Sequence, residues 1–95
     1  MNPGHRIVRA LAVYAMPARH PEVFVVLEVP DRNWLGSMDF WLLDPPSGSI
    51  WRVANLAHVD TPSPNRDCVG LMPVSGSGKL VEGLELHMVP IGWQP

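Results

Sequence analysis

Residues 67–86 read DCVGLMPV, then SGSGK, then LVEGLEL, so two short apolar runs flank a Gly/Ser loop. Short runs of apolar and β-branched residues bounded by turn residues are typical of β-strands. The segment therefore predicts two strands joined by a glycine-bearing turn.

Proline and glycine divide the rest of the chain in the same way. The 95 residues include 11 prolines and 8 glycines spread along the sequence, and a proline inside a helix removes a donor and clashes with the preceding turn. Four more runs of strand-forming residues lie between these breaks, at 7–14, 23–29, 38–43 and 50–56. Because closure removes exposed sheet edges, we predict an all-β fold, a small closed or nearly closed six-stranded antiparallel β-barrel.

This barrel is expected to form a single domain over residues 1–95, with an extended tail at 90–95. Within it, the Pro-Pro-Ser-Gly turn predicts a hairpin in which Asp44 faces Ser49. Counting back from that pair gives one wholly apolar face, which includes Trp51. On the other face Trp41 lies across from Arg52, a pairing that predicts a cation–π contact.

Charge and cysteine content limit the classes of function. The formal net charge of −2 argues against a protein built mainly to coat nucleic acid or an anionic membrane. The single cysteine, Cys68, cannot form an internal disulfide, which favours a reducing compartment. Its apolar neighbours predict that Cys68 is a small buried hydrophobic residue. No apolar run has the length of a bilayer span. We expect a cytoplasmic protein with no membrane association.

The charge is unevenly distributed along the chain. Five basic or imidazole side chains precede the first acid, Glu22: His5, Arg6, Arg9, Arg19 and His20. A solvent-exposed charged surface is the simple explanation for these residues, and a surface that contacts an anion or RNA is the alternative.

The chain contains no recognisable catalytic motif. The Gly-Lys at 78–79 invites comparison with a phosphate-binding loop, but Pro73 and Leu80 occupy the positions where that motif needs glycine and a hydroxyl. The loop is therefore expected to be a flexible hairpin loop. His58 and Asp60 could share one face of a strand as two metal ligands or an acid–base pair, although a structural network gives the same pairing. A small metal or hydrolytic protein using this pair is an alternative; we expect no enzyme activity and no cofactor.

Four tryptophans are many for a chain of this length. Two of them, Trp41 and Trp51, fall inside the predicted hairpin and are expected to be structural. Trp34 follows Arg32 in a loop and Trp93 lies in the proline-bounded tail, so both are expected to be exposed anchors. The predicted binding residues are Arg32, Trp34 and Trp93.

The segment 67–86 also carries a resemblance to a known family. Asp67 precedes Val69-Gly70-Leu71, a loop follows, and Val81 precedes Gly83 and a closing apolar run. This order resembles the second-domain β-barrel of translational GTPases such as elongation factor Tu. The run 24–29 is similar to the opening strand of that barrel, whereas the glycine-rich turn of the family is replaced by 32–36.

The resemblance implies a free-standing barrel, because the 95 residues include no GTP-binding domain and GTP hydrolysis does not carry over. In the family this barrel contacts tRNA ends, ribosomal RNA or a neighbouring domain. We therefore expect a non-enzymatic binding or accessory module with a protein partner, RNA being the weaker alternative. An immunity or antitoxin-like protein that neutralises a partner is another alternative, and exposed tryptophans together with Asp31 and Asp60 would suit it.

Overall fold

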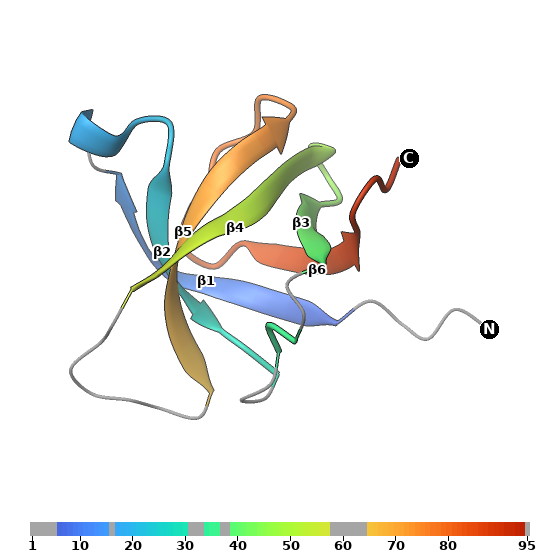
Figure 1. The fold of residues 1–95 in the computed structure, drawn as a ribbon, viewed down its shortest axis with the longest axis horizontal. Helices are drawn as coiled ribbons and strands as arrows, with labels where there is room; N and C mark the ends of the chain where they lie inside the picture. The colour runs from blue at the N-terminus through green and yellow to red at the C-terminus, as the bar shows by residue number, and fades with distance from the viewer. Residues whose placement is uncertain (1–5, 16, 31–33, 37–38, 58–64, 95) are drawn as a thin grey trace.

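The computed structural model describes residues 6–15, 17–30, 34–36, 39–57 and 65–94. They form a closed antiparallel barrel with the strand order β1-β2-β5-β4-β3-β6 (Figure 1). The strands are β1 (Ile7–Ala15), β2 (Val23–Glu28), β3 (Phe40–Asp44), β4 (Ser49–Ala57), β5 (Arg66–Ser75) and β6 (Glu85–Pro90). A short 3-10 helix, η1 (Pro17–Arg19), connects β1 to β2. The predicted six-stranded barrel is confirmed.

Alternation along each strand separates the barrel interior from its outside. On β2, Val25 and Leu27 are fully buried in the main core, whereas Phe24 and Val26 alternate with them and face outward. The inward-facing side chains of all six strands form one cluster that includes Val8, Leu42, Trp51, Val69, Leu71 and Leu86. This cluster is the apolar core that holds the strands together.

The β3–β4 hairpin has the predicted register. Asp44 pairs with Ser49 and Leu42 with Trp51, and Trp51 is buried in the core as expected. The described residues do not contain the predicted cation–π contact between Trp41 and Arg52: the β3–β4 pairing ends at Leu42 and Trp51. Trp41 instead packs against a cluster that includes Ile50 and Val89.

The segment 67–86 does contain two strands, but they are not neighbours. β5 lies between β2 and β4, whereas β6 begins only at Glu85 and lies between β1 and β3. Gly76 and Gly83 adopt φ angles of 86° and 87°, which favour glycine, and these turns carry the connection away from β5. The expected flexible hairpin loop is instead anchored, because the Gly78 amide donates to Ser49 Oγ over 2.6 Å.

A second apolar cluster lies on the outside of the barrel. Leu43, Ile50 and Val89 are each at most 5% exposed, although each alternates with an inward-facing residue. Trp41 and Trp93 pack against them. The tail expected to be extended turns back after β6, since the Trp93 amide donates to the Pro90 carbonyl over 3.0 Å. The tail thus covers part of the outer surface over β3, β4 and β6.

Candidate binding surface

The three residues predicted from sequence do not form one site. Trp34 is 1% exposed and belongs to the main core, so the expectation that this loop tryptophan is an exposed anchor is wrong. Its ring lies 5.7 Å from the Phe40 ring, and its indole N–H donates to Asp67 Oδ2 over 2.6 Å. A large ring whose polar atom has a partner can close the barrel interior without losing a hydrogen bond.

The other predicted residues are placed differently. Trp93 is half-buried in the outer cluster rather than beside Trp34. Arg32, His58 and Asp60 lie outside the described residues, as does Asp31. Within the described ranges, no three His, Cys, Asp or Glu side chains are grouped as metal ligands would be.

The apolar surface that the tail leaves uncovered lies on the outside of β1, β2 and β5. It is formed by Ala12, Tyr14, Phe24, Val26 and Cys68, which we call the outer apolar face. Adjacent strands bring them together, because Ala12 pairs with Val26 and Val26 with Cys68, while Tyr14 pairs with Phe24. Tyr14 is 53% exposed and the other four are half-buried. An apolar surface of this kind, bordered by polar residues, is typical of a protein interaction site.

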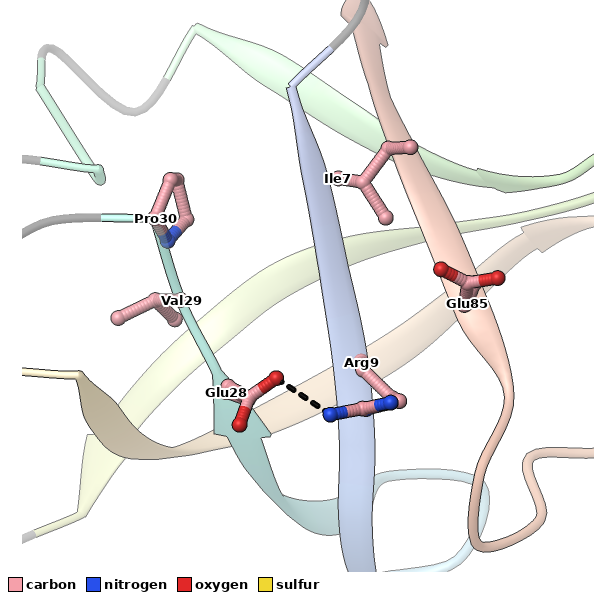
Figure 2. Close-up of a pocket in the computed structure, with 6 residues that line it drawn as sticks. All are labelled: Ile7, Arg9, Glu28, Val29, Pro30 and Glu85. Atoms are coloured by element: carbon pink, nitrogen blue, oxygen red, sulfur yellow. Dashed lines mark hydrogen bonds and ion pairs between the residues drawn. The ribbon is translucent and has the colours of Figure 1, made fainter.

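A row of charged residues borders one end of the outer apolar face. Arg9 of β1 pairs in register with Glu28 of β2 and with Glu85 of β6, and Glu28 pairs in turn with Arg66 of β5. Arg9 Nη2 lies 2.7 Å from Glu28 Oε1, and Figure 2 shows the two side chains pointing toward one another. Both are about half exposed, so solvent screens the pair and it contributes little to stability.

Beyond this ion pair the strands diverge, since the β1–β2 register ends at Arg9 and Glu28 while β1 continues to Ile7. A small groove of about 240 Å³ lies in the gap, lined by Ile7, Val29 and Pro30 together with charged side chains (Figure 2). Its volume is below the roughly 300–1,000 Å³ of ordinary ligand pockets. We regard it as part of the border.

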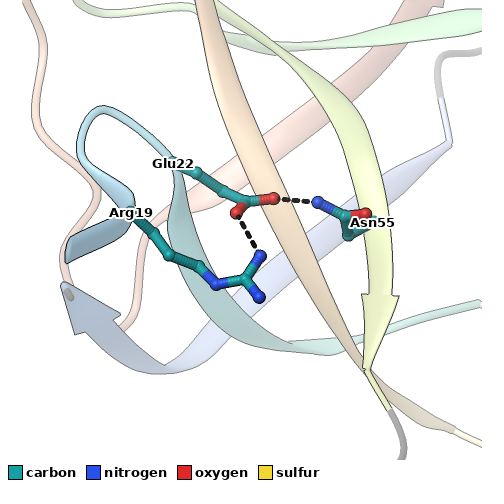
Figure 3. A network of polar contacts seen from close by, with 3 residues as sticks. All are labelled: Arg19, Glu22 and Asn55. Carbon is teal, nitrogen blue, oxygen red and sulfur yellow. Dashed lines mark hydrogen bonds and ion pairs between the residues drawn. The ribbon is translucent and has the colours of Figure 1, made fainter.

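A buried carboxylate borders the opposite end of the face. Glu22, immediately before β2, is 6% exposed and accepts a hydrogen bond from the Asn55 side-chain amide of β4. Its other oxygen lies 3.3 Å from Arg19 Nη1 of η1 (Figure 3). The Glu22 side chain lies over Gly70 of β5, where a Cβ atom would collide with the carboxylate. Glycine at this position therefore allows a charged side chain to cross β5 and join three elements.

Arg19 also connects this border to the apolar face, because its guanidinium carbon lies 5.4 Å from the centroid of the Phe24 ring. This is a cation–π distance. A separate cavity of about 390 Å³ lies at the turn between β1 and β2 and is lined by Ala15, Pro17, His20, Glu22 and Val23. Pro17 of η1 contributes an apolar wall, as do Ala15 and Val23, which pair across the ends of β1 and β2.

Cys68 lies within the outer apolar face rather than in the barrel core. Burial raises the pKa of the Cys68 thiol, so less of the nucleophilic thiolate is present at neutral pH. This environment suits a small apolar contact and does not activate a nucleophile.

A third cavity, of about 400 Å³, lies between the β3–β4 turn and the start of β6 and is lined by Asp44, Glu85 and His87, among others. Asp44 Oδ2 accepts a hydrogen bond from Ser47 Oγ over 2.6 Å. Asp44 Oδ1 is buried and has no partner among the described residues. A buried water molecule is the ordinary partner for such an oxygen.

Sequence reasoning missed both borders and the outer apolar face. Glu22 and Asn55 are separated by 33 residues, and nothing local to either predicts their contact. The sequence does contain one indication of the outer apolar face, because residues 23–27 are apolar at every position instead of alternating between apolar and polar. A strand with two apolar faces indicates that its outer side is also covered.

Comparison with known proteins gives no relative for this barrel: no family model, no curated protein and no solved structure matches the chain. Among the described residues, no helix combines the length and the apolar character that crossing a membrane requires.

Proposed function

We propose that this protein is a non-enzymatic binding module that docks a protein partner on the outer apolar face. The observation that carries the proposal is the pairing of Tyr14 with Phe24 and of Val26 with Cys68 on adjacent strands, outside the barrel and between two polar borders. Exposed aromatic residues surrounded by a polar rim are a common arrangement at protein interfaces.

The charges of the borders favour protein over RNA. Arg9 is paired with Glu28 and Arg19 with Glu22, so two arginines of the amino-terminal positive segment face carboxylates rather than a shared positive surface. The net charge of −2 adds a further cost to binding a polyanion. An RNA contact would therefore have to come from other parts of the chain.

The resemblance to the second domain of translational GTPases leads to a narrower form of the proposal, a translation-factor-like barrel. It is supported by the closed six-stranded antiparallel barrel and by the order of Asp67, Val69 and Gly70. In this form the partner would belong to the translation machinery. If the partner were instead a toxic protein, the barrel would act as an immunity or antitoxin-like protein that neutralises it.

Affinity capture from the native lysate tests the proposal when the chain is compared with two matched lysine variants. Val26→Lys places a charge in the outer apolar face, where it should greatly reduce capture of the partner, because the charge would have to be desolvated in the interface. Val81→Lys changes a residue that is 53% exposed and lies outside the face, and it should leave capture unchanged.

Salt separates the two classes of partner in the same experiment. A protein held on an apolar face should stay bound in high salt, whereas an RNA held through phosphates should be released. Equal capture by Val26→Lys and the unmodified chain would contradict the proposal. Loss of capture on replacing His58 and Asp60 with alanine, with Val26→Lys still active, would favour the metal or hydrolytic alternative.

A further inference from the structure

The row of charged residues that borders the outer apolar face is complementary to itself. It consists of Glu85 of β6, Arg9 of β1, Glu28 of β2 and Arg66 of β5, and each member pairs in register with the next. The signs therefore alternate from strand to strand, and Figure 2 shows Arg9 between Glu28 and Glu85. Reversing the order of this charged row exchanges every carboxylate for a guanidinium and every guanidinium for a carboxylate.

We propose that a second copy of this chain docks on the outer apolar face and forms a dimer with two-fold symmetry. The axis runs between β1 and β2 and parallel to them, so the two barrels meet along these strands. This inference rests on the proposed function, because the second copy uses the same surface. A partner of different sequence would compete with it for that surface.

The charges select the direction of the axis. A two-fold axis parallel to the strands reverses the charged row, so Arg9 of one copy meets Glu28 of the other and Glu28 meets Arg9, as an isologous interface requires. The ion pair within each chain is kept, because a guanidinium carries five N–H donors and a carboxylate accepts several hydrogen bonds. An axis perpendicular to the strands would place Arg9 against Arg9 and Glu28 against Glu28, which like-charge repulsion disfavours.

The same axis brings the apolar residues of the two copies together. Tyr14 pairs with Phe24 and Ala12 with Val26 across β1 and β2, so each of these residues meets its pairing partner from the other copy. The exposed ring of Tyr14 thereby packs against Phe24. Because the barrel is closed, β5 and β6 curve away from this contact. An interface centred on two strands is small, and we expect a dimer with a Kd on the order of 0.1–1 mM.

Analytical ultracentrifugation of the purified intact chain at increasing concentration tests the dimer with two charge reversals. Arg9→Glu and Glu28→Arg each place like charges across the axis, and each should weaken self-association at least about tenfold. In an equimolar mixture of the two variants, one chain is acidic at both positions and the other is basic at both. The mixed dimer should then form at least as tightly as the dimer of the unmodified chain, which also shows that both variants are folded.

Glu82→Arg is the matched control for Glu28→Arg, because it makes the same change of charge on an exposed residue outside the charged row. It should dimerise as the unmodified chain does. An unmodified chain that stays monomeric at concentrations well above the expected Kd would overturn the inference, as would a mixture that associates no better than either variant alone. Either result would leave the capture experiment with Val26→Lys unaffected, so failure of the dimer and failure of the proposed function can be distinguished.

Discussion

Within the described part of the chain, the barrel carries apolar residues on its outside in two regions, and described segments cover one of the two. Over β3, β4 and β6, Leu43, Ile50 and Val89 are at most 5% exposed because Trp41 and the tail residue Trp93 pack on them. Figure 1 shows the tail leaving β6 on the side of the barrel where β3 lies. Over β1, β2 and β5, Tyr14 stays 53% exposed and its neighbours are half-buried.

This difference shows that position on the barrel wall does not decide whether an outer apolar residue is structural. Where the chain supplies its own cover, the outer residues extend the core and contribute to folding. Where no described segment covers them, the same residue types remain available to a partner. Substitutions in the covered region should therefore mainly lower the free energy of unfolding, whereas substitutions in the outer apolar face should mainly weaken binding of the partner.

The largest loss of stability is expected from replacing Trp34, which is buried in the main core of the barrel. Trp34→Ala removes a fully buried ring and leaves Asp67 without its donor, and we expect the free energy of unfolding to fall by about 3–5 kcal/mol in urea denaturation. Trp93→Ala removes a half-buried ring from the covered region and should cost roughly 1–2 kcal/mol. A larger loss for Trp93→Ala than for Trp34→Ala would show that the tail, not the loop tryptophan, is the main closure.

Gly70→Ala tests whether the border of the uncovered region is built on close contact. The added methyl group meets the Glu22 carboxylate, so we expect a loss of about 1–3 kcal/mol in the free energy of unfolding. Combining it with Glu22→Ala removes the collision. The double variant should then be less destabilised than the sum of the two single changes, and strict additivity would contradict the contact.

Two valines give a matched comparison between the regions. Val89 is 1% exposed in the covered cluster, whereas Val26 is half-buried in the outer apolar face. We expect Val89→Ala to cost about 1–3 kcal/mol and Val26→Ala less than about 1 kcal/mol, because only the first leaves a cavity. Equal losses in thermal unfolding would mean that the two regions are equally structural.

Local patterns in the sequence predicted more of the fold than of the binding surface. The strands and the β3–β4 register follow from alternation and turn residues, which act over a few positions. The placement of β5 and β6 apart does not, since it depends on pairing between distant strands and on glycine turns within 76–84. A short loop sequence could not show that Trp34 would turn inward to a carboxylate 33 residues away.

The most direct test of the central claim is chemical modification of Tyr14, the single tyrosine of the chain, in the captured complex. The account predicts that nitration of Tyr14, measured by mass spectrometry, is fast in the free protein and strongly slowed by the partner. A control variant, Tyr14→Phe with Val81→Tyr, moves the tyrosine to a position with the same exposure of 53% outside the face, where the partner should give no protection. Equal modification of Tyr14 in the free and the captured protein would contradict docking on the outer apolar face.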